Sequence, residues 1–185
     1  MGVSAMLRNL AAAWALVAVF AGAPASVAQD LPIAAFAGQF VGTGLARDDL
    51  SEYFDLTVRD LGVTIAVRGQ GFNLAWTTVL RDRGDPDNPT AKRKTTALDF
   101  VATGRAGVFR GATPSDPMSG QPYAWARIKG QTLTVHLLVI AADGSYEMHT
   151  YDRTLTPFGM DLKFTRVSDG EPTRSVTAKL TKQAN

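Results

Sequence analysis

Cysteine is absent from the 185-residue sequence, and histidine occurs only at positions 136 and 149. Without cysteine, the chain can form neither a disulfide nor a cysteine-linked lipid anchor. The sequence also lacks a Gly-x-Ser-x-Gly motif and any Gly-Lys dipeptide, so it has neither the nucleophile elbow of a serine hydrolase nor a Walker-type phosphate loop. With no visible set of nucleophile, base and orienting group, the sequence favours a protein that is not an enzyme.

A strong excess of one charge is missing as well. Without Arg8, which lies in the N-terminal segment, 18 basic residues oppose 17 acidic ones. The one local basic cluster, residues 91–94, has no aromatic residues interleaved with it, so we interpret it as a solvated loop. We therefore expect no nucleic-acid partner.

The first 28 residues have the pattern of a secretory signal peptide. Arg8 provides the positive charge, residues 10–23 are uncharged and apolar, and Ser26-Val27-Ala28 forms a small-x-small cleavage site. The apolar run is shorter than the ~20 residues that a membrane-spanning helix needs, which favours a signal peptide over an anchor. The expected mature chain, residues 29–185, is a single domain, periplasmic or secreted, without a membrane span.

Residues 123–155 show the strand pattern most clearly. Aliphatic side chains at odd positions from Leu133 alternate with Thr132, Thr134 and His136, as in a half-buried strand. Gly130 and Gly144 lie between neighbouring runs and tolerate the positive φ of hairpin turns. This stretch predicts consecutive antiparallel hairpins.

The same alternation predicts about ten strands and no long helix. The predicted strands are residues 36–44, 54–59, 63–68, 72–80, 95–103, 123–128, 132–140, 145–155, 160–166 and 174–181. Asp60-Leu61-Gly62 is interpreted as a turn, and residues 81–94 and 104–122 as long loops rich in Gly and Pro. Val108-Phe109-Arg110 interrupts the second loop. Glycines 38, 42 and 44 share one face of the first strand, which indicates a bend or a close approach of backbones.

Many antiparallel strands in sequence order leave exposed edges unless the sheet closes. We therefore predict an all-β fold, an antiparallel up-and-down barrel of about 8–10 strands, with a β-sandwich as the alternative. A barrel of this size has room inside for one small ligand.

The segment Phe36-Ala37-Gly38-Gln39-Phe40, the meander and the mature length resemble the calycin group, that is, lipocalin-like and avidin-like barrels. In lipocalins a Gly-x-Trp on the first strand meets an Arg near the end of the last barrel strand. Here Phe40 replaces the Trp, and Arg166 is the matching Arg, so the resemblance implies a barrel end closed by Phe40 and Arg166. The stretches around Tyr151 and Phe164 also resemble an uncharacterised group of secreted bacterial proteins, which implies no activity.

Six side chains fall on faces that we interpret as inward and are candidate pocket residues. They are Trp76, Phe100, Tyr123, Trp125, Tyr146 and Met148. The leading hypothesis is an exported, non-catalytic barrel that binds a small apolar or amphipathic molecule in its interior, without a cofactor. The alternatives are an envelope structural or interaction protein with a packed barrel that acts through its long loops, or, third, an enzyme of unknown type.

Three further groups of polar residues carry atoms of the kind found in metal or catalytic sites. His136, His149 and Glu147 offer metal-ligating atoms, but a further ligand is missing, so no metal site is predicted. Asp85, Asp87 and Asn88 lack the spacing of a calcium-binding loop. Asp152, if it points inward beside Met148, would need a partner such as Arg166 or Arg127, an arrangement that favours a structural ion pair over catalysis.

Overall fold

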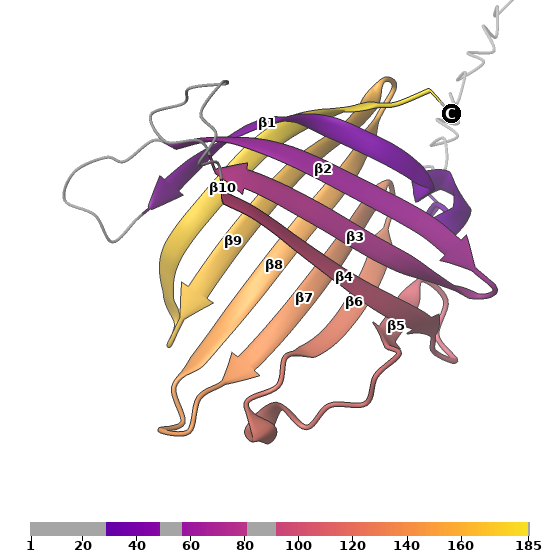
Figure 1. Cartoon of the computed structure of the whole chain (residues 1–185). Helices are drawn as coiled ribbons and strands as arrows, with labels where there is room; N and C mark the ends of the chain where they lie inside the picture. Colours follow the sequence, from indigo (N-terminus) through magenta and orange to yellow (C-terminus); the bar gives the residue numbers. More distant parts are fainter. Residues whose placement is uncertain (1–28, 49–56, 81–91, 185) are drawn as a thin grey trace, which may run out of the picture.

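The computed structural model describes residues 29–48, 57–80 and 92–184. Ten antiparallel strands form one closed barrel in the order β1-β10-β9-β8-β7-β6-β5-β4-β3-β2, which confirms the predicted fold class (Figure 1). The strands are β1 (Gly38–Asp48), β2 (Thr57–Arg68), β3 (Gly71–Leu80), β4 (Lys92–Ala102), β5 (Val108–Gly111), β6 (Tyr123–Lys129), β7 (Thr132–Ile140), β8 (Tyr146–Thr156), β9 (Gly159–Ser168) and β10 (Glu171–Lys182).

The first and last strands close the barrel. β1 pairs with β10 from Phe40 opposite Lys182 onward, and with β2 on its other side. A Cβ at Gly42 would collide with the Lys179 carbonyl oxygen, and one at Gly44 would lie 2.8 Å from the Ala178 Cβ. The alternating glycines therefore permit the close approach of backbones that the sequence indicated. In Figure 1 strands β1–β4 cross steeply over β6–β10.

Two details of the strand assignment differ from the prediction. Asp60-Leu61-Gly62 is not a turn but lies inside β2, which stays paired with β3 from Arg59 to Arg68. Residues 104–122 contain the short strand β5 and a 3-10 turn, η3 (Pro117–Ser119). The described residues still form ten strands, as predicted. The two strands predicted on either side of Asp60-Leu61-Gly62 are replaced by the single strand β2, and β5 is an additional strand. The predicted signal peptide, residues 54–56 and residues 81–91 lie outside the described residues.

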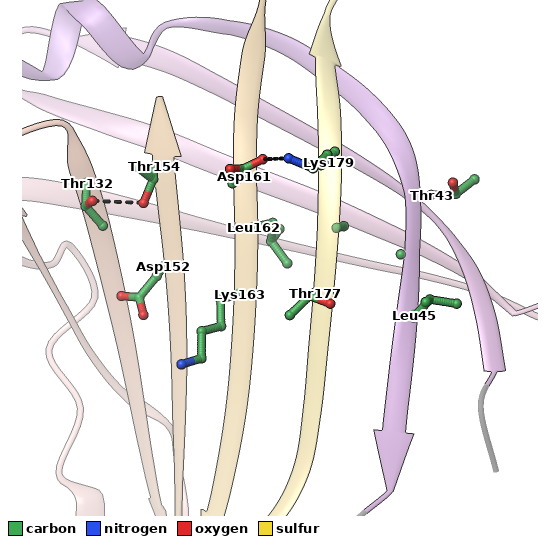
Figure 2. A pocket seen from close by; sticks show the side chains of 12 residues that line it. Thr43, Leu45, Thr132, Asp152, Thr154, Asp161, Leu162, Lys163, Thr177 and Lys179 are labelled. Carbon is green, nitrogen blue, oxygen red and sulfur yellow. Dashed lines mark hydrogen bonds and ion pairs between the residues drawn. The ribbon is translucent and has the colours of Figure 1, made fainter. Parts of the chain in front are cut away.

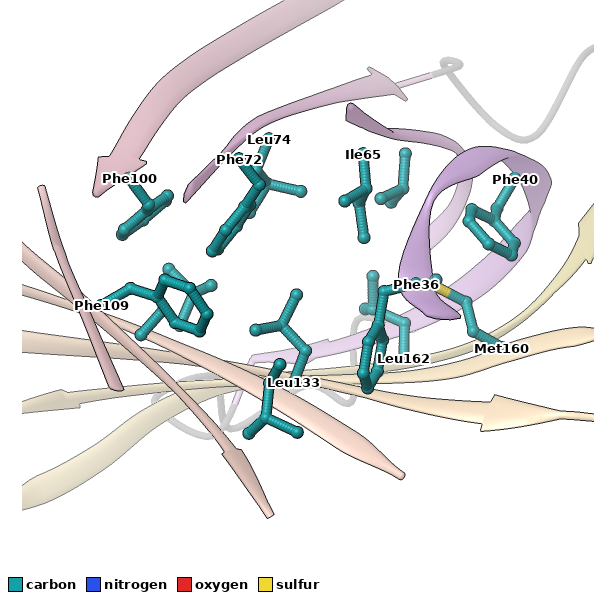
Figure 3. Packing of buried hydrophobic residues seen from close by; sticks show 14 of the residues in the cluster. Phe36, Phe40, Ile65, Phe72, Leu74, Phe100, Phe109, Leu133, Met160 and Leu162 are labelled. Carbon is teal, nitrogen blue, oxygen red and sulfur yellow. The ribbon is translucent and has the colours of Figure 1, made fainter. Parts of the chain in front are cut away.

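One half of the barrel interior is packed with apolar side chains. The Phe72 ring stacks on Phe100 with 4.8 Å between centroids and meets the edge of Phe109 at 5.1 Å. A 3-10 turn, η1 (Ile33–Phe36), covers this end and inserts the fully buried Phe36 beside Met160 (Figure 3). This half is a conventional close-packed core.

Inward side chains change character along the strands. On β2 they run from Ile65 through Val63 and Leu61 to Arg59, and on β9 from Met160 through Leu162 and Phe164 to Arg166. β3, β4, β8 and β10 follow a similar order, from apolar residues in the core to polar or basic residues at the other end. The barrel interior therefore has an apolar half and a basic half.

Candidate functional site: a basic cavity inside the barrel

The basic half of the interior is hollow. A cavity of about 490 Å³ lies there, a size within the range of small-molecule sites. Its walls are partly apolar, with Val63, Leu137, Leu162 and Val176 among them. Its basic residues come from five strands and are Arg59, Lys94, Arg153, Arg166 and Arg174, together with His149. No Asp or Glu is among the described residues that line it.

Arg153 lies deepest among these basic residues. It projects inward from β8, opposite Leu133 on β7 and Leu162 on β9, and its side chain is fully buried. Its Nε, Nη1 and Nη2 atoms have no hydrogen-bond partner within the described part of the chain. Burial lowers the pKa of Arg153 to about 10, so the guanidinium remains charged at neutral pH.

Aromatic rings surround the Arg153 guanidinium. Its Cζ lies 5.6 Å from the Trp76 ring centroid and 5.3 Å from that of Tyr151, within the range of cation–π contacts. Tyr151 also packs on Trp76 at 5.1 Å and on Phe164 at 4.7 Å. Burial raises the pKa of the Tyr151 hydroxyl, although the charge of Arg153 opposes that effect. The cavity therefore combines flat apolar surfaces with a buried positive charge.

Farther along the cavity, basic groups are partnered. His149 Nε2 lies 2.9 Å from Glu147 Oε2, and Arg166 Nη1 lies 3.9 Å from Glu147 Oε1. Arg166 Nε donates a hydrogen bond of 2.9 Å to the hydroxyl of the buried Thr173. Arg166 is also the direct cross-strand neighbour of Arg174. The arrangement is suited to attracting and orienting an anion.

Of the six predicted pocket residues, Trp76 alone lines this cavity. Phe100 does point inward, as predicted, but it is 2% exposed and stacked on Phe72 within the packed half. The sequence pattern correctly oriented both side chains but could not distinguish the filled half of the barrel from the hollow one.

Tyr123 and Trp125 lie on the outer face, so their predicted inward orientation is wrong. On β6 the inward residues are Ala124, Ala126 and Ile128, all buried, and Tyr123 is 40% exposed. The physical reason is space, because the phenylalanine rings of the packed half leave room for small alanines rather than for large rings. Trp125 instead stacks on His136 outside the barrel, with 4.7 Å between ring centroids.

Tyr146 and Met148 are also outward, which corrects the predicted faces of β8. The register places Arg153, Tyr151 and His149 opposite the inward Leu133, Val135 and Leu137, and cross-strand partners share a face. Tyr146 is accordingly 38% exposed. Asp152 points outward too, where it accepts a 2.7 Å hydrogen bond from the Thr134 hydroxyl, so the considered inward ion pair is absent.

Phe40 and Arg166 do not form the expected closing pair. Phe40 is buried near Met160 in the packed half (Figure 3), whereas Arg166 lines the cavity six residues farther along β9. At about 3.4 Å per residue, that separates the two by roughly 20 Å along the strand. The cation over the Phe40 ring is Lys182, with its Nζ 5.7 Å from the centroid. This end of the barrel is covered by η1 instead.

The two histidines are on opposite faces of the barrel wall. His149 is inside, and His136 is outside, with Nδ1 3.2 Å from the Thr150 hydroxyl. Within the three described stretches there is no group of three His, Asp or Glu residues that could hold a metal ion. In the same stretches, no helix has the length and apolar character needed to cross a membrane. Asp85, Asp87 and Asn88 lie outside the described residues.

A wider depression of about 770 Å³ lies on the outer surface over β7–β10 and β1. Its side chains include Thr43, Asp152, Asp161, Lys163 and Lys179, which Figure 2 shows on the strands around it. Lys179 Nζ lies 3.4 Å from Asp161 Oδ1, and the Thr132 and Thr154 hydroxyls are 2.9 Å apart. With its charges balanced and solvated, this depression lacks the buried, unmet charge of the interior cavity.

Sequence reasoning missed Arg153, the most deeply buried basic residue that lines the cavity. The sequence contained a signal for its inward orientation. Arg153 alternates in step with Tyr151 and Leu155 on β8, which pairs with the clearly patterned β7. A rule that places charges outside assigns β8 the wrong way round when the interior itself holds a charge.

Comparison with known proteins adds little to this geometry. No protein-family model matches the sequence, and no match is found among curated proteins. Among solved structures, the chain is similar to the S-type phycobiliprotein lyase CPES from Guillardia theta, with 7% identity and a TM-score of 0.37. That similarity covers 83% of this chain and 91% of the lyase. The assignment as a closed barrel rests on the strand pairing itself.

Proposed function

We propose that this protein is a non-catalytic carrier or sensor that binds one small amphipathic molecule inside its barrel, as in the calycin-type proteins that the sequence resembles. The observation that carries the proposal is the cavity of about 490 Å³, with partly apolar walls, beside the close-packed apolar half of the barrel interior. Such pockets are the usual sites of small ligands in barrels of this size.

Binding of an uncharged apolar dye tests the proposal. N-phenyl-1-naphthylamine should bind the purified protein with saturable, one-to-one stoichiometry, followed by its fluorescence. Trp76→Ala should weaken binding by about 2- to 12-fold, corresponding to the 0.5–1.5 kcal/mol of an aromatic contact. Trp125→Ala is the matched control and should leave the dissociation constant unchanged, because Trp125 lies outside the barrel. Failure of the wild-type protein to bind the dye would reject an interior binding site.

The alternative function is that of an interaction protein. It is favoured by aromatic and sulfur-containing side chains on the outer face of β6 and β8 and on η3, where Tyr123, Tyr146 and Met118 are 40%, 38% and 71% exposed. Exposed residues of this kind are enriched in protein interfaces. A barrel that binds no apolar dye but loses a partner on Trp125→Ala would support this second function.

We also propose that the protein acts after export, in the periplasm or outside the cell. The support is the N-terminal pattern ending in Ser26-Val27-Ala28. Mass spectrometry of the protein from its own host should find an N-terminus near Gln29, and an intact Met1 in the cytoplasm would contradict export.

A further inference from the structure

No hydrogen bond from the buried guanidinium of Arg153 to a carboxylate is found in the part of the chain that the structure describes. Its sequence neighbour Asp152 points to the outer face and accepts from Thr134. Glu147, on the same face as Arg153 but six residues away on β8, contacts His149 and Arg166. The immediate surroundings of the guanidinium are the Trp76 and Tyr151 rings, which offer only cation–π contacts.

An unpaired buried charge is costly for a protein, and a guanidinium has five N–H donors that are unmet when it stays dry. Natural proteins offset that cost with a carboxylate or phosphate held by two parallel hydrogen bonds. Arg153 borders the cavity, but its guanidinium has no accessible surface beneath the Trp76 and Tyr151 rings. An anion in the cavity can therefore supply this missing partner once one of these rings shifts.

We propose that Arg153 is the anion-binding residue of the cavity, and that the ligand is an amphipathic molecule with an anionic group, a carboxylate or a phosphate, bound deep in the barrel. This inference rests on the proposed interior binding. The apolar part of the ligand then lies along Leu137, Phe164 and Val176, which line the same space.

The distribution of charge supports this orientation. Lys94, Arg166 and Arg174 line the cavity beyond Arg153, on the basic side of the interior. Positive residues along a narrow cavity attract anions and repel cations. An anionic group that moves inward therefore passes Arg166, which is paired with Glu147, before it reaches Arg153, which has no hydrogen-bond partner among the described residues.

A pair of dyes with one skeleton isolates the contribution of the charge. N-phenyl-1-naphthylamine is neutral, and 8-anilinonaphthalene-1-sulfonate adds a sulfonate to it. We expect the sulfonate to bind more tightly by about 10- to 100-fold, the equivalent of a charge-assisted hydrogen bond. Competition by decanoate and by decyl phosphate, with decanol as the neutral control, then distinguishes a carboxylate from a phosphate ligand.

Variants at two arginines locate the effect. Arg153→Met should remove the preference for the sulfonate while leaving the affinity for the neutral dye within about threefold, and Arg153→Lys should restore part of it. Arg127→Met is the matched control, because it removes the same charge from the exposed outer face of β6 and should change neither affinity. Far-ultraviolet circular dichroism checks that each variant is folded.

The outcomes separate this inference from the proposed function. Equal binding of both dyes by the wild-type protein, or a preference that persists in Arg153→Met, overturns the role of Arg153 while interior binding stands. Displacement by decanol as effective as that by both anions overturns it as well. If neither dye binds, the proposed function itself fails.

Discussion

The two halves of the barrel interior differ in how their side chains fill the space between the strands. In one half, Phe36, Phe72, Phe100 and Phe109 fill the space, and η1 covers the end. In the other half the same strands present Trp76, Tyr151 and Arg153 around a cavity. The contrast indicates that the packed half provides most of the stability of the fold, which allows the hollow half to hold a buried charge at a cost to stability.

The largest expected effect is a loss of stability in the packed half. Phe72→Ala should lower the free energy of unfolding by about 3–5 kcal/mol, because it leaves a hole between the Phe100 ring stacked on it and the edge-on Phe109 ring. Trp76→Ala, the counterpart on β3 in the hollow half, should cost less, since it enlarges a space that already exists. Urea denaturation of both variants measures the difference, and equal losses would contradict the division into two halves.

The second prediction is a gain in stability rather than a loss. Arg153→Met should raise the free energy of unfolding of the ligand-free protein by about 1–4 kcal/mol, because an apolar side chain of similar length replaces an unpaired buried charge. The same urea denaturation, without ligand, checks it. A clear destabilisation would mean that the guanidinium is already stabilised in the free protein. The hollow half would then not hold a buried charge at a cost to stability.

A smaller effect is expected at the outer surface. Trp125→Ala should lower the free energy of unfolding by about 0.5–1.5 kcal/mol, the value of an aromatic pair, since Trp125 mainly stacks on His136. Thermal unfolding measures this loss. A loss as large as that of Phe72→Ala would show that the outer face, and not only the packed half, holds the barrel together.

The smallest effect concerns the pH dependence of stability. Burial lowers the pKa of His136 from its ordinary 6.5, with Asp152 opposing the shift and Arg127 adding to it. Below about pH 6.5 the unfolded chain therefore takes up this proton before the folded one, and stability falls as the pH decreases toward the folded pKa. His136→Gln should flatten the change in unfolding free energy between pH 7 and pH 5. An unchanged slope would mean that titratable groups other than His136 cause this pH dependence.

The local features of the fold could be predicted from the sequence, because they depend on neighbours along the chain. Gly130 and Gly144 lie in the connections between neighbouring strands, as expected, and have positive φ values of 57° and 88°. The alternation in β3 and β7 oriented their side chains correctly. Closure of a meander of about ten strands followed from the need to remove its edges.

The orientation of β6 and β8 was decided only by the tertiary structure. On β8 both parities carry large or charged residues, whereas on β6 the aromatic rings lie on one parity and Ala124, Ala126 and Ile128 on the other. The register against β7 determines which set points inward on each strand. Ala126 faces the barrel interior because the phenylalanines of other strands already occupy that space. Arg153 is inside because its cross-strand partners Leu133 and Leu162 are inside, whatever the cost of burying its charge. Alternation along a strand determined that there are two faces, and contacts between distant strands determined which one encloses the cavity.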